Sequence, residues 1–250
     1  MVASEHGHRI DNLIWYVHLL MGILFVGWLC FFIFTLIRFR ESKVEKADYT
    51  GVKGHTSSYV EAGVAAIEAL LLIGFAVPIW NATVSEFPDP ATAENIHIVG
   101  KQYAWIGRYP GVDRQFAKQD FRLADKENQY GVVLDDPSGK DDFAVTGEIK
   151  VPVNRDVICH VSSMDVIHSF CIRAMRVTQD ATPGLRIPTS FKPVREGKYA
   201  IQCAQLCGAG HSRMAGVLNV VSEEEFDAWL EEKVPLDPGA AEAVEMIEYE

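Results

Sequence analysis

Two long apolar runs near the N-terminus most constrain how this chain can fold. The first, at residues 13–37, carries no acidic or basic side chain apart from His18. As a helix it would be about 38 Å long, which exceeds the roughly 30 Å hydrocarbon core of a bilayer. The run is too long for a signal peptide, and no basic segment precedes it. We therefore predict a retained transmembrane helix over residues 13–37.

The second run, at residues 59–80, is apolar except for Glu61 and Glu68 and predicts a second transmembrane helix. Glu61 and Glu68 are seven residues apart, so they would share one helix face. Carboxyl groups at membrane depth are costly and often belong to proton pathways. A carboxylate near a helix end can instead be solvated at the interface, and both interpretations of Glu61 stay open here.

The charges around these runs predict their orientation. The intervening residues 38–53 carry five basic side chains, at Arg38, Arg40, Lys43, Lys46 and Lys53. Residues 81–96 carry acidic side chains and no Lys or Arg. Because basic loops stay in the cytoplasm, we expect both termini and the rest of the chain on the other side. In a bacterium this is the periplasmic or extracytoplasmic side of the inner (plasma) membrane.

From about residue 93, short apolar segments alternate with turn signals, which is typical of an all-β sandwich. Ser222-Glu-Glu-Glu225 is a capping box that begins a short helix ending near Glu232. The chain thus divides into residues 1–92 (N-terminal segment and helix hairpin), 93–232 (β domain with the short helix) and 233–250 (acidic tail). The predicted strands cover residues 95–108, 147–152, 157–162, 166–177, 187–191, 198–203 and 217–221.

The formal net charge of −11 argues against a nucleic-acid partner. It suits the docking of a basic soluble protein by electrostatic attraction. A solvated acidic surface without any partner explains the same charge equally well.

The segment Cys203-Ala-Gln-Leu-Cys207-Gly-Ala-Gly-His211-Ser-Arg-Met214 gathers two thiols, an imidazole and a thioether within one loop. A second imidazole, His168, lies upstream on a predicted neighbouring strand. Soft sulfur beside imidazole is typical of copper, for which a thioether is a suitable ligand. A blue-copper site needs only one thiolate, so this set indicates two copper ions that share both sulfurs.

Simpler interpretations of these residues remain. Cys203 and Cys207 alone could form a disulfide in an exported domain. Zinc could take both thiolates with His168 and His211, although Met214 would then have no role. Of the other three cysteines, Cys30 lies in an apolar helix, and Cys159 and Cys171 are expected to be buried thiols, with a disulfide between them as the alternative.

On these residues the chain resembles subunit II of haem–copper cytochrome c oxidases over residues 13–230. Its loop is similar to the family's dicopper (CuA) motif, C-x-E-x-C-G-x-x-H-x-x-M. The resemblance implies a two-helix transmembrane hairpin followed by a cupredoxin-like Greek-key domain. It makes Cys203 and Cys207 bridging thiolates. It also implies one imidazole and one weak ligand for each copper, taken from His168, His211, Met214 and the carbonyl of Gln205.

Three further positions are interpreted through the resemblance. The family's aromatic patch for electron uptake, G-H-Q-W-Y-W-x-Y, corresponds to Gly100-Lys-Gln-Tyr103-Ala-Trp105, although aromatic residues on a strand can simply be packing. Glu61 resembles the carboxylate at the mouth of a proton channel, because Ala76-Val-Pro78 follows at the family's distance. Val64 and Ala65 replace the usual Trp and Thr.

Two polar residues near the copper motif also follow from the resemblance. Gln205 replaces a Glu whose side chain reaches a magnesium ion shared with subunit I, so that site is in doubt because an amide is a weaker ligand for Mg²⁺. Asp165 sits where relatives present acidic groups to their donor.

The function implied is electron transfer. The chain would accept electrons from a cytochrome c-type donor, soluble or membrane-bound. It would pass them to haem in subunit I, which also holds CuB, for oxygen reduction coupled to proton translocation. Partners would be subunit I, further oxidase subunits and membrane lipid, and oxygen chemistry would reside outside this chain.

Three alternative functions are considered. The CuA subunit of a related nitric oxide reductase fits the same residues. A quinol oxidase subunit would lack the copper ligands. A membrane-anchored copper-delivery protein would bind one copper with few ligands.

Overall fold

The computed structural model describes residues 1–43, 46, 49–50, 54–124, 128, 130–133, 135–139 and 141–233. Lys53 of the basic segment and the predicted acidic tail from residue 234 lie outside the described residues. The chain forms two compact units: His8–Glu86 is one, and Met1–Gly7 together with the chain from Phe87 is the other.

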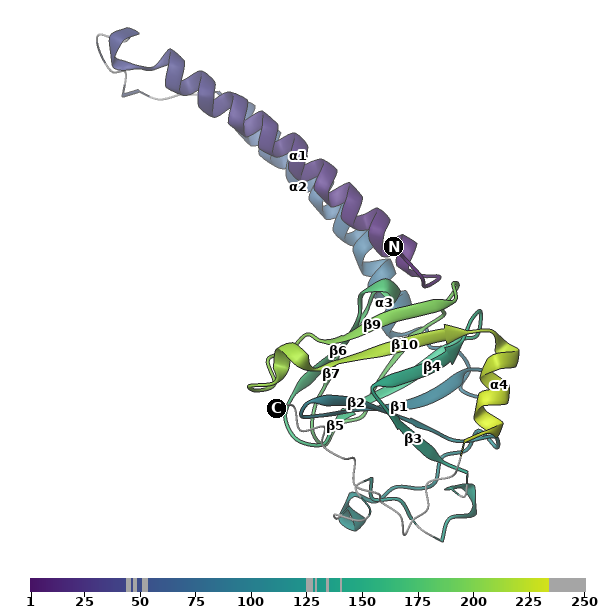
Figure 1. Cartoon of the computed structure of the whole chain (residues 1–250). Coiled ribbons are helices and arrows are strands. Elements are labelled where there is room, and N and C mark those ends of the chain that lie inside the picture. The colour runs from purple at the N-terminus through teal and green to yellow at the C-terminus, as the bar shows by residue number, and fades with distance from the viewer. Residues whose placement is uncertain are drawn as a thin grey trace. The chain divides into compact units, whose positions relative to one another are not determined.

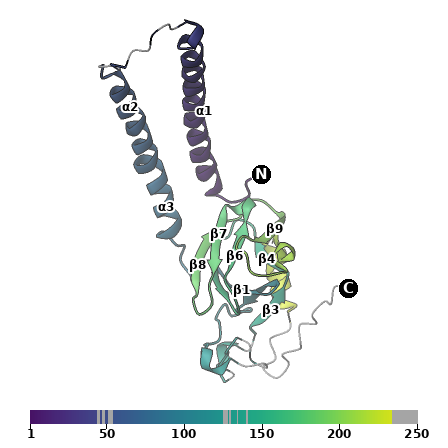
Figure 2. The same ribbon diagram turned by 90° about the vertical axis from the view of Figure 1, so that its left-hand side faces the viewer.

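The first unit is helical. Helix α1 covers Gly7–Arg38, and helix α2 (Thr56–Leu71) continues through a π-helical turn (Leu72–Ala76) into α3 (Val77–Val84). The stretches Gly7–Arg38 and Thr56–Val84 are both long and apolar enough to cross a membrane, and they contain the predicted spans. Figure 2 shows the two stretches running alongside one another. The Tyr16 ring meets the Phe75 ring edge-on, with centroids 5.8 Å apart.

The π-helical turn lies just before Pro78, the second residue of α3. Proline lacks a backbone N–H and crowds the preceding helical turn, and a wider turn relieves that crowding. The local sequence therefore explains why the second span is a helix with one irregular turn.

The second unit is a sandwich of two five-stranded sheets, visible in Figure 1. The first sheet has the order β3 (Phe143–Thr146), β2 (Ala104–Tyr109), β1 (Glu94–Lys101), β5 (Val157–Ser163) and β8 (Ile187–Phe191). The second has the order β4 (Glu148–Pro152), β10 (Ala215–Val221), β9 (Gly197–Cys203), β6 (His168–Ile172) and β7 (Val177–Ala181). The predicted all-β, cupredoxin-like sandwich is confirmed.

The core lies between the two sheets. Trp105, Phe170 and Ile201 are fully buried there, and so is Phe226 of helix α4 (Glu223–Glu231). The side chain of Ser222 accepts a hydrogen bond from the backbone N–H of Glu225, so the predicted helix start is confirmed.

Two strand predictions differ from the structure, and one strand was missed. Residues 95–108 form two antiparallel strands, β1 and β2, joined by a tight turn at residues 102–103. Residues 166–177 contain β6 and a 3₁₀ turn (Arg173–Met175) that leads into β7, and β3 was not predicted. Apolar and aromatic residues flank both turns, and neither turn contains glycine or proline, so the sequence pattern does not mark them.

Residues 110–142 connect β2 to β3 and are anchored by an ion pair. The guanidinium of Arg108 lies 2.6 Å from the carboxylate of Asp142, and both side chains are buried. The same carboxylate accepts the backbone N–H of Ala117 at 3.2 Å. Because an unpaired buried charge is costly, these contacts hold the chain around Ala117 and Asp142 against β2.

The N-terminal residues belong to the β unit and not to the helical one. The N–H of Ala3 donates to the carbonyl of Ala174, and the N–H of Val194 donates to the carbonyl of Ala3, each at 2.8 Å. Ser4 is fully buried and donates its hydroxyl to the carbonyl of Met175 at 2.7 Å. The residues ahead of α1 are thus bonded to the sandwich through Ala3 and Ser4.

Candidate metal centre

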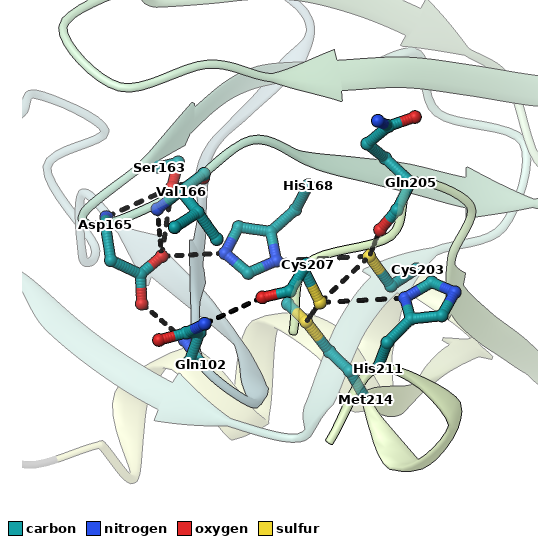
Figure 3. A network of polar contacts seen from close by, with 10 residues as sticks. All are labelled: Gln102, Ser163, Asp165, Val166, His168, Cys203, Gln205, Cys207, His211 and Met214. Carbon is teal, nitrogen blue, oxygen red and sulfur yellow. Dashed lines mark hydrogen bonds and ion pairs between the residues drawn. The ribbon is translucent and has the colours of Figure 1, made fainter. Parts of the chain in front are cut away.

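The candidate ligands come from two neighbouring strands and one loop. His168 is the first residue of β6, and Cys203 is the last residue of β9. These strands pair in the register Phe170 to Cys203, which brings His168 close to the end of β9. The loop from β9 to β10 carries Cys207, His211 and Met214 and returns to the same place (Figure 3).

The two thiols lie side by side, and each has an imidazole of its own. The Sγ atoms of Cys203 and Cys207 are 3.8 Å apart. Nδ1 of His168 lies 3.9 Å from Sγ of Cys203, and Nδ1 of His211 lies 3.6 Å from Sγ of Cys207. The donor atoms of His168, Cys203 and Cys207 all lie within 4.8 Å of one another.

Two weaker donors complete the set. Sδ of Met214 lies 3.7 Å from Sγ of Cys207, and the carbonyl oxygen of Gln205 lies 3.1 Å from Sγ of Cys203. The side chain of Gln205 is exposed and points away from the sulfurs in Figure 3. The structure therefore brings together all six predicted metal-site residues, with Gln205 contributing its backbone.

Burial is uneven across the centre. His168, Cys207 and Met214 are buried, whereas Cys203 and His211 are partly exposed. The exposed side opens into a hollow of about 170 Å³ whose lining includes Cys203 and His211. The centre therefore has one side enclosed by the core and one side at the surface.

The cysteines are not cross-linked. All five are free thiols, and the 3.8 Å between Cys203 and Cys207 far exceeds a disulfide bond of about 2.05 Å. Cys159 and Cys171 lie in different sheets, as β5 and β6 show. Burial raises the pKa of Cys159 to about 12, so this thiol is chemically inert.

The donor set fits copper bound by thiolates. Burial, reinforced by the neighbouring Cys203, raises the pKa of Cys207 to about 11, so a bound cation is needed to keep this thiol deprotonated. Metal–sulfur bonds of about 2.3 Å can reach both sulfurs across a gap of 3.8 Å. The thioether of Met214 lies among the donors, which favours copper over zinc.

A hydrogen-bond network surrounds His168. Nε2 of His168 lies 2.8 Å from one carboxylate oxygen of Asp165, whose other oxygen accepts the backbone N–H of Gln102 at 2.7 Å. Burial raises the pKa of Asp165, but the bonds from Gln102, His168 and Val166 outweigh it and hold the pKa below its ordinary value. Asp165 is therefore a carboxylate that is already engaged beside the centre.

The two aromatic candidates occupy different environments. Tyr103 is 38 % exposed and lies over the ligand loop, where a Cβ added at Gly208 would come within 2.6 Å of its hydroxyl. Trp105 is fully buried, and its ring centroid lies 5.9 Å from that of His168. Tyr103 thus connects the surface with the loop, whereas Trp105 packs beneath it.

Sequence reasoning missed the contribution of Gln102. Its side-chain amide donates to the carbonyl of Cys207 at 2.7 Å. The sequence pointed to Gln102 only through its aromatic neighbours, because the turn that contains it was not predicted.

Glu61 and Glu68 lie on exposed positions of α2, in the helical unit.

Comparison with known proteins identifies the family. Residues 95–221 match the family described as cytochrome c oxidase subunit II, periplasmic domain. The alternative cytochrome c oxidase subunit 2 of Bradyrhizobium diazoefficiens is 30 % identical over 234 residues, which cover 93 % of this chain and 82 % of the relative. The chain belongs to the cytochrome c oxidase subunit II family.

Other subunit II proteins are similar over comparable lengths. The cytochrome c oxidase subunit 2 of Thermostichus vulcanus is 30 % identical over 254 residues, covering 91 % of this chain and 76 % of that protein. A crystal structure of the periplasmic domain of subunit II from Bradyrhizobium japonicum is 31 % identical. It covers 58 % of this chain and 94 % of that one, with a TM-score of 0.42. This subunit II is thus a membrane-anchored component of a haem–copper oxidase.

Proposed function

We propose that this subunit II is the electron-transfer subunit of its oxidase and holds a dinuclear CuA centre. The observation that carries the proposal is the pair of unbonded thiols, 3.8 Å apart, each with its own imidazole. Cys203 and Cys207 would bridge the two ions. His168 and His211 would supply one nitrogen to each, and Met214 and the Gln205 carbonyl would be the weak ligands.

The protein's contribution is a rigid frame. When bound, the copper pair supplies a group that gains and loses one electron at a time. His168 and Cys203 are held by paired strands, and Met214 is fixed against the core. Residues held in this way would restrict changes of geometry when a bound copper pair is oxidised or reduced, which would favour fast transfer.

The proposed donor is a cytochrome c-type protein, soluble or membrane-bound, that approaches Tyr103. Tyr103 is the exposed aromatic side chain that touches the ligand loop. The net charge of −11 supports attraction of a basic donor. Electrons would then pass to haem in subunit I. The basic side chains within residues 38–53 predict that the β domain and its centre lie on the periplasmic side.

We also propose that Glu61 is a proton-uptake group for subunit I. It lies in the second turn of α2, near the cytoplasmic end implied by the predicted orientation. The exposure of its side chain in the isolated chain leaves it free to face a partner subunit.

Metal analysis of the purified native complex tests this function. We expect two copper ions for this chain in addition to the CuB of subunit I, haem from subunit I, and reduction of that haem by cytochrome c. Cys207→Ser should lose the copper pair. Cys171→Ser is the matched control, because Cys171 is a buried free thiol outside the donor set.

Other outcomes would contradict the proposal. A single ion per chain, zinc in place of copper, or a chain that purifies without haem would point to delivery or storage of metal. Reduction of nitric oxide in place of oxygen would move the complex to the related reductases and leave the copper assignment unchanged.

A further inference from the structure

Gln102 joins two segments that carry metal-site residues. Its backbone N–H donates to Asp165, in the turn that precedes β6, at 2.7 Å. Its side-chain amide donates to the carbonyl of Cys207, in the ligand loop, also at 2.7 Å. Figure 3 shows Gln102 between these two partners.

Asp165 extends this connection to the imidazole. Its second carboxylate oxygen lies 2.8 Å from Nε2 of His168. When Nε2 carries the proton and donates to the carboxylate, Nδ1 keeps its lone pair. That nitrogen is the one facing Sγ of Cys203 at 3.9 Å. The carboxylate therefore selects the tautomer and the ring orientation that a metal ion needs.

The ligand loop is shaped to receive Gln102. Gly208 follows Cys207 with φ of +133°, a conformation that side chains rarely adopt. A Cβ at Gly208 would lie 2.8 Å from the amide nitrogen of Gln102. The exposed glutamine thus has a fixed place against the loop.

We propose that Gln102 and Asp165 are positioning residues that together hold Cys207 and His168 at a fixed separation before copper binds. Three consecutive hydrogen bonds run from the backbone of a thiol ligand to the ring of an imidazole ligand. This inference rests on the proposed copper centre. It gives Asp165 a role inside the protein, distinct from presenting charge to a donor.

A purely structural role is the competing explanation. Asp165 also accepts the N–H of Val166 at 2.7 Å, and its own N–H donates to the hydroxyl of Ser163 at 3.2 Å. Such local bonds could shape the turn without affecting a metal. The test therefore needs readouts that belong to copper and a separate measure of folding.

The experiment compares the full chain with Gln102→Leu, Asp165→Asn and the double variant. Gln115→Leu and Asp180→Asn are controls at exposed positions outside the network. Copper affinity is measured by competition with a chelator. The optical and EPR spectra, the reduction potential and the thermal unfolding of the metal-free chain are recorded in parallel.

We expect each single variant to bind copper about 10–100-fold more weakly than the controls, with altered spectra. Asp165→Asn should also raise the reduction potential, because removing a negative charge disfavours the oxidised state. The double variant should lose little more copper affinity than the single variant with the larger loss, because both substitutions interrupt one network.

Three results would overturn the inference. One is control-like affinity and spectra for Gln102→Leu, which keeps its backbone bond and is expected to fold. A second is a lower Tm of the metal-free variants with unchanged affinity and potential, which would show a structural role alone. If the wild-type chain binds no copper pair, the proposed function falls as well, so the two failures are distinguishable.

Discussion

A methyl group at Gly100 would lie 2.9 Å from Cδ2 of His168, and 3.2 Å from the ring of Trp105. Strand β1 therefore touches the proposed ligand directly, and only glycine leaves the imidazole its place. We expect Gly100→Ala to displace His168 and to cost about 1–3 kcal/mol through overpacking. The copper spectrum of the loaded protein should change, and thermal unfolding should occur at lower temperature.

Gly184→Ala is the control for this prediction. Gly184 has φ of +76° and open space around it, so alanine strains the backbone without touching the centre. It should lower stability while the copper spectrum stays as in the wild type. Equal spectral changes in both variants would contradict the assigned role of Gly100.

Tyr103 is predicted to pass electrons through its ring. Tyr103→Leu keeps an apolar contact with the ligand loop and removes the aromatic system. We expect uptake of electrons from a reduced cytochrome c-type donor to slow by about tenfold, equivalent to roughly 1.4 kcal/mol. Stopped-flow kinetics measures this rate, and the copper spectrum should be unaffected.

Tyr103→Phe separates the ring from its hydroxyl group. It retains the aromatic surface, so its rate should stay near that of the wild type. A wild-type rate in Tyr103→Leu would show that the residue is packing only.

Local patterns were enough to predict two long apolar helices and most of the cluster of candidate donors. The apolar runs exceed the bilayer thickness, and Cys203, Cys207, His211 and Met214 lie within one loop, so spacing alone implies their proximity. His168 was proposed from its place on a predicted neighbouring strand, and the resemblance then linked it to that loop. Its closeness depends on the pairing of β6 with β9, which spacing does not encode.

The supporting residues could not be predicted in this way. Apolar and aromatic residues lie on both sides of Gly100-Lys-Gln102, so the pattern predicts one strand over 95–108 and not the turn at Gln102. Asp165 is exposed, as expected of a residue that faces a donor, and the structure adds a contact between its carboxylate and His168 that the sequence does not predict. Contacts between residues far apart in sequence decide such roles, and hydrophobic periodicity carries no information about them.

Glu61 is predicted to limit proton uptake by the assembled oxidase. Glu61→Gln keeps the shape of the side chain and removes its acid group, so steady-state turnover and proton pumping should slow. Glu68→Gln is the matched control, because Glu68 is a second carboxyl group on the same helix face. Unchanged turnover in Glu61→Gln, measured with oxygen consumption and proton release, would end the assignment.

Glu94 is predicted to make the β unit less stable as pH rises. The side chain is 1 % exposed, and burial raises its pKa to about 7, although Arg114 and Arg155 act in the opposite direction. The guanidinium of Arg155 lies 3.6 Å from the carboxylate of Glu94 but also forms an ion pair with Asp227, which limits how far it lowers the pKa of Glu94. The folded state holds the proton of Glu94 more tightly than the unfolded state does. The stabilisation of the fold by this proton is therefore complete below about pH 4.5 and is lost as pH rises towards 7.

Glu94→Gln should remove this dependence. A shift from 4.5 to about 7 corresponds to a loss of about 3 kcal/mol between the two limits. Thermal unfolding of the full chain at pH 5 and pH 8 should therefore separate wild type from variant mainly at the higher pH. Glu223→Gln, an exposed neighbour of Arg155, should keep the wild-type pH dependence. If the unfolding temperatures of wild type and Glu94→Gln change with pH in parallel, the buried carboxyl group does not titrate in this range.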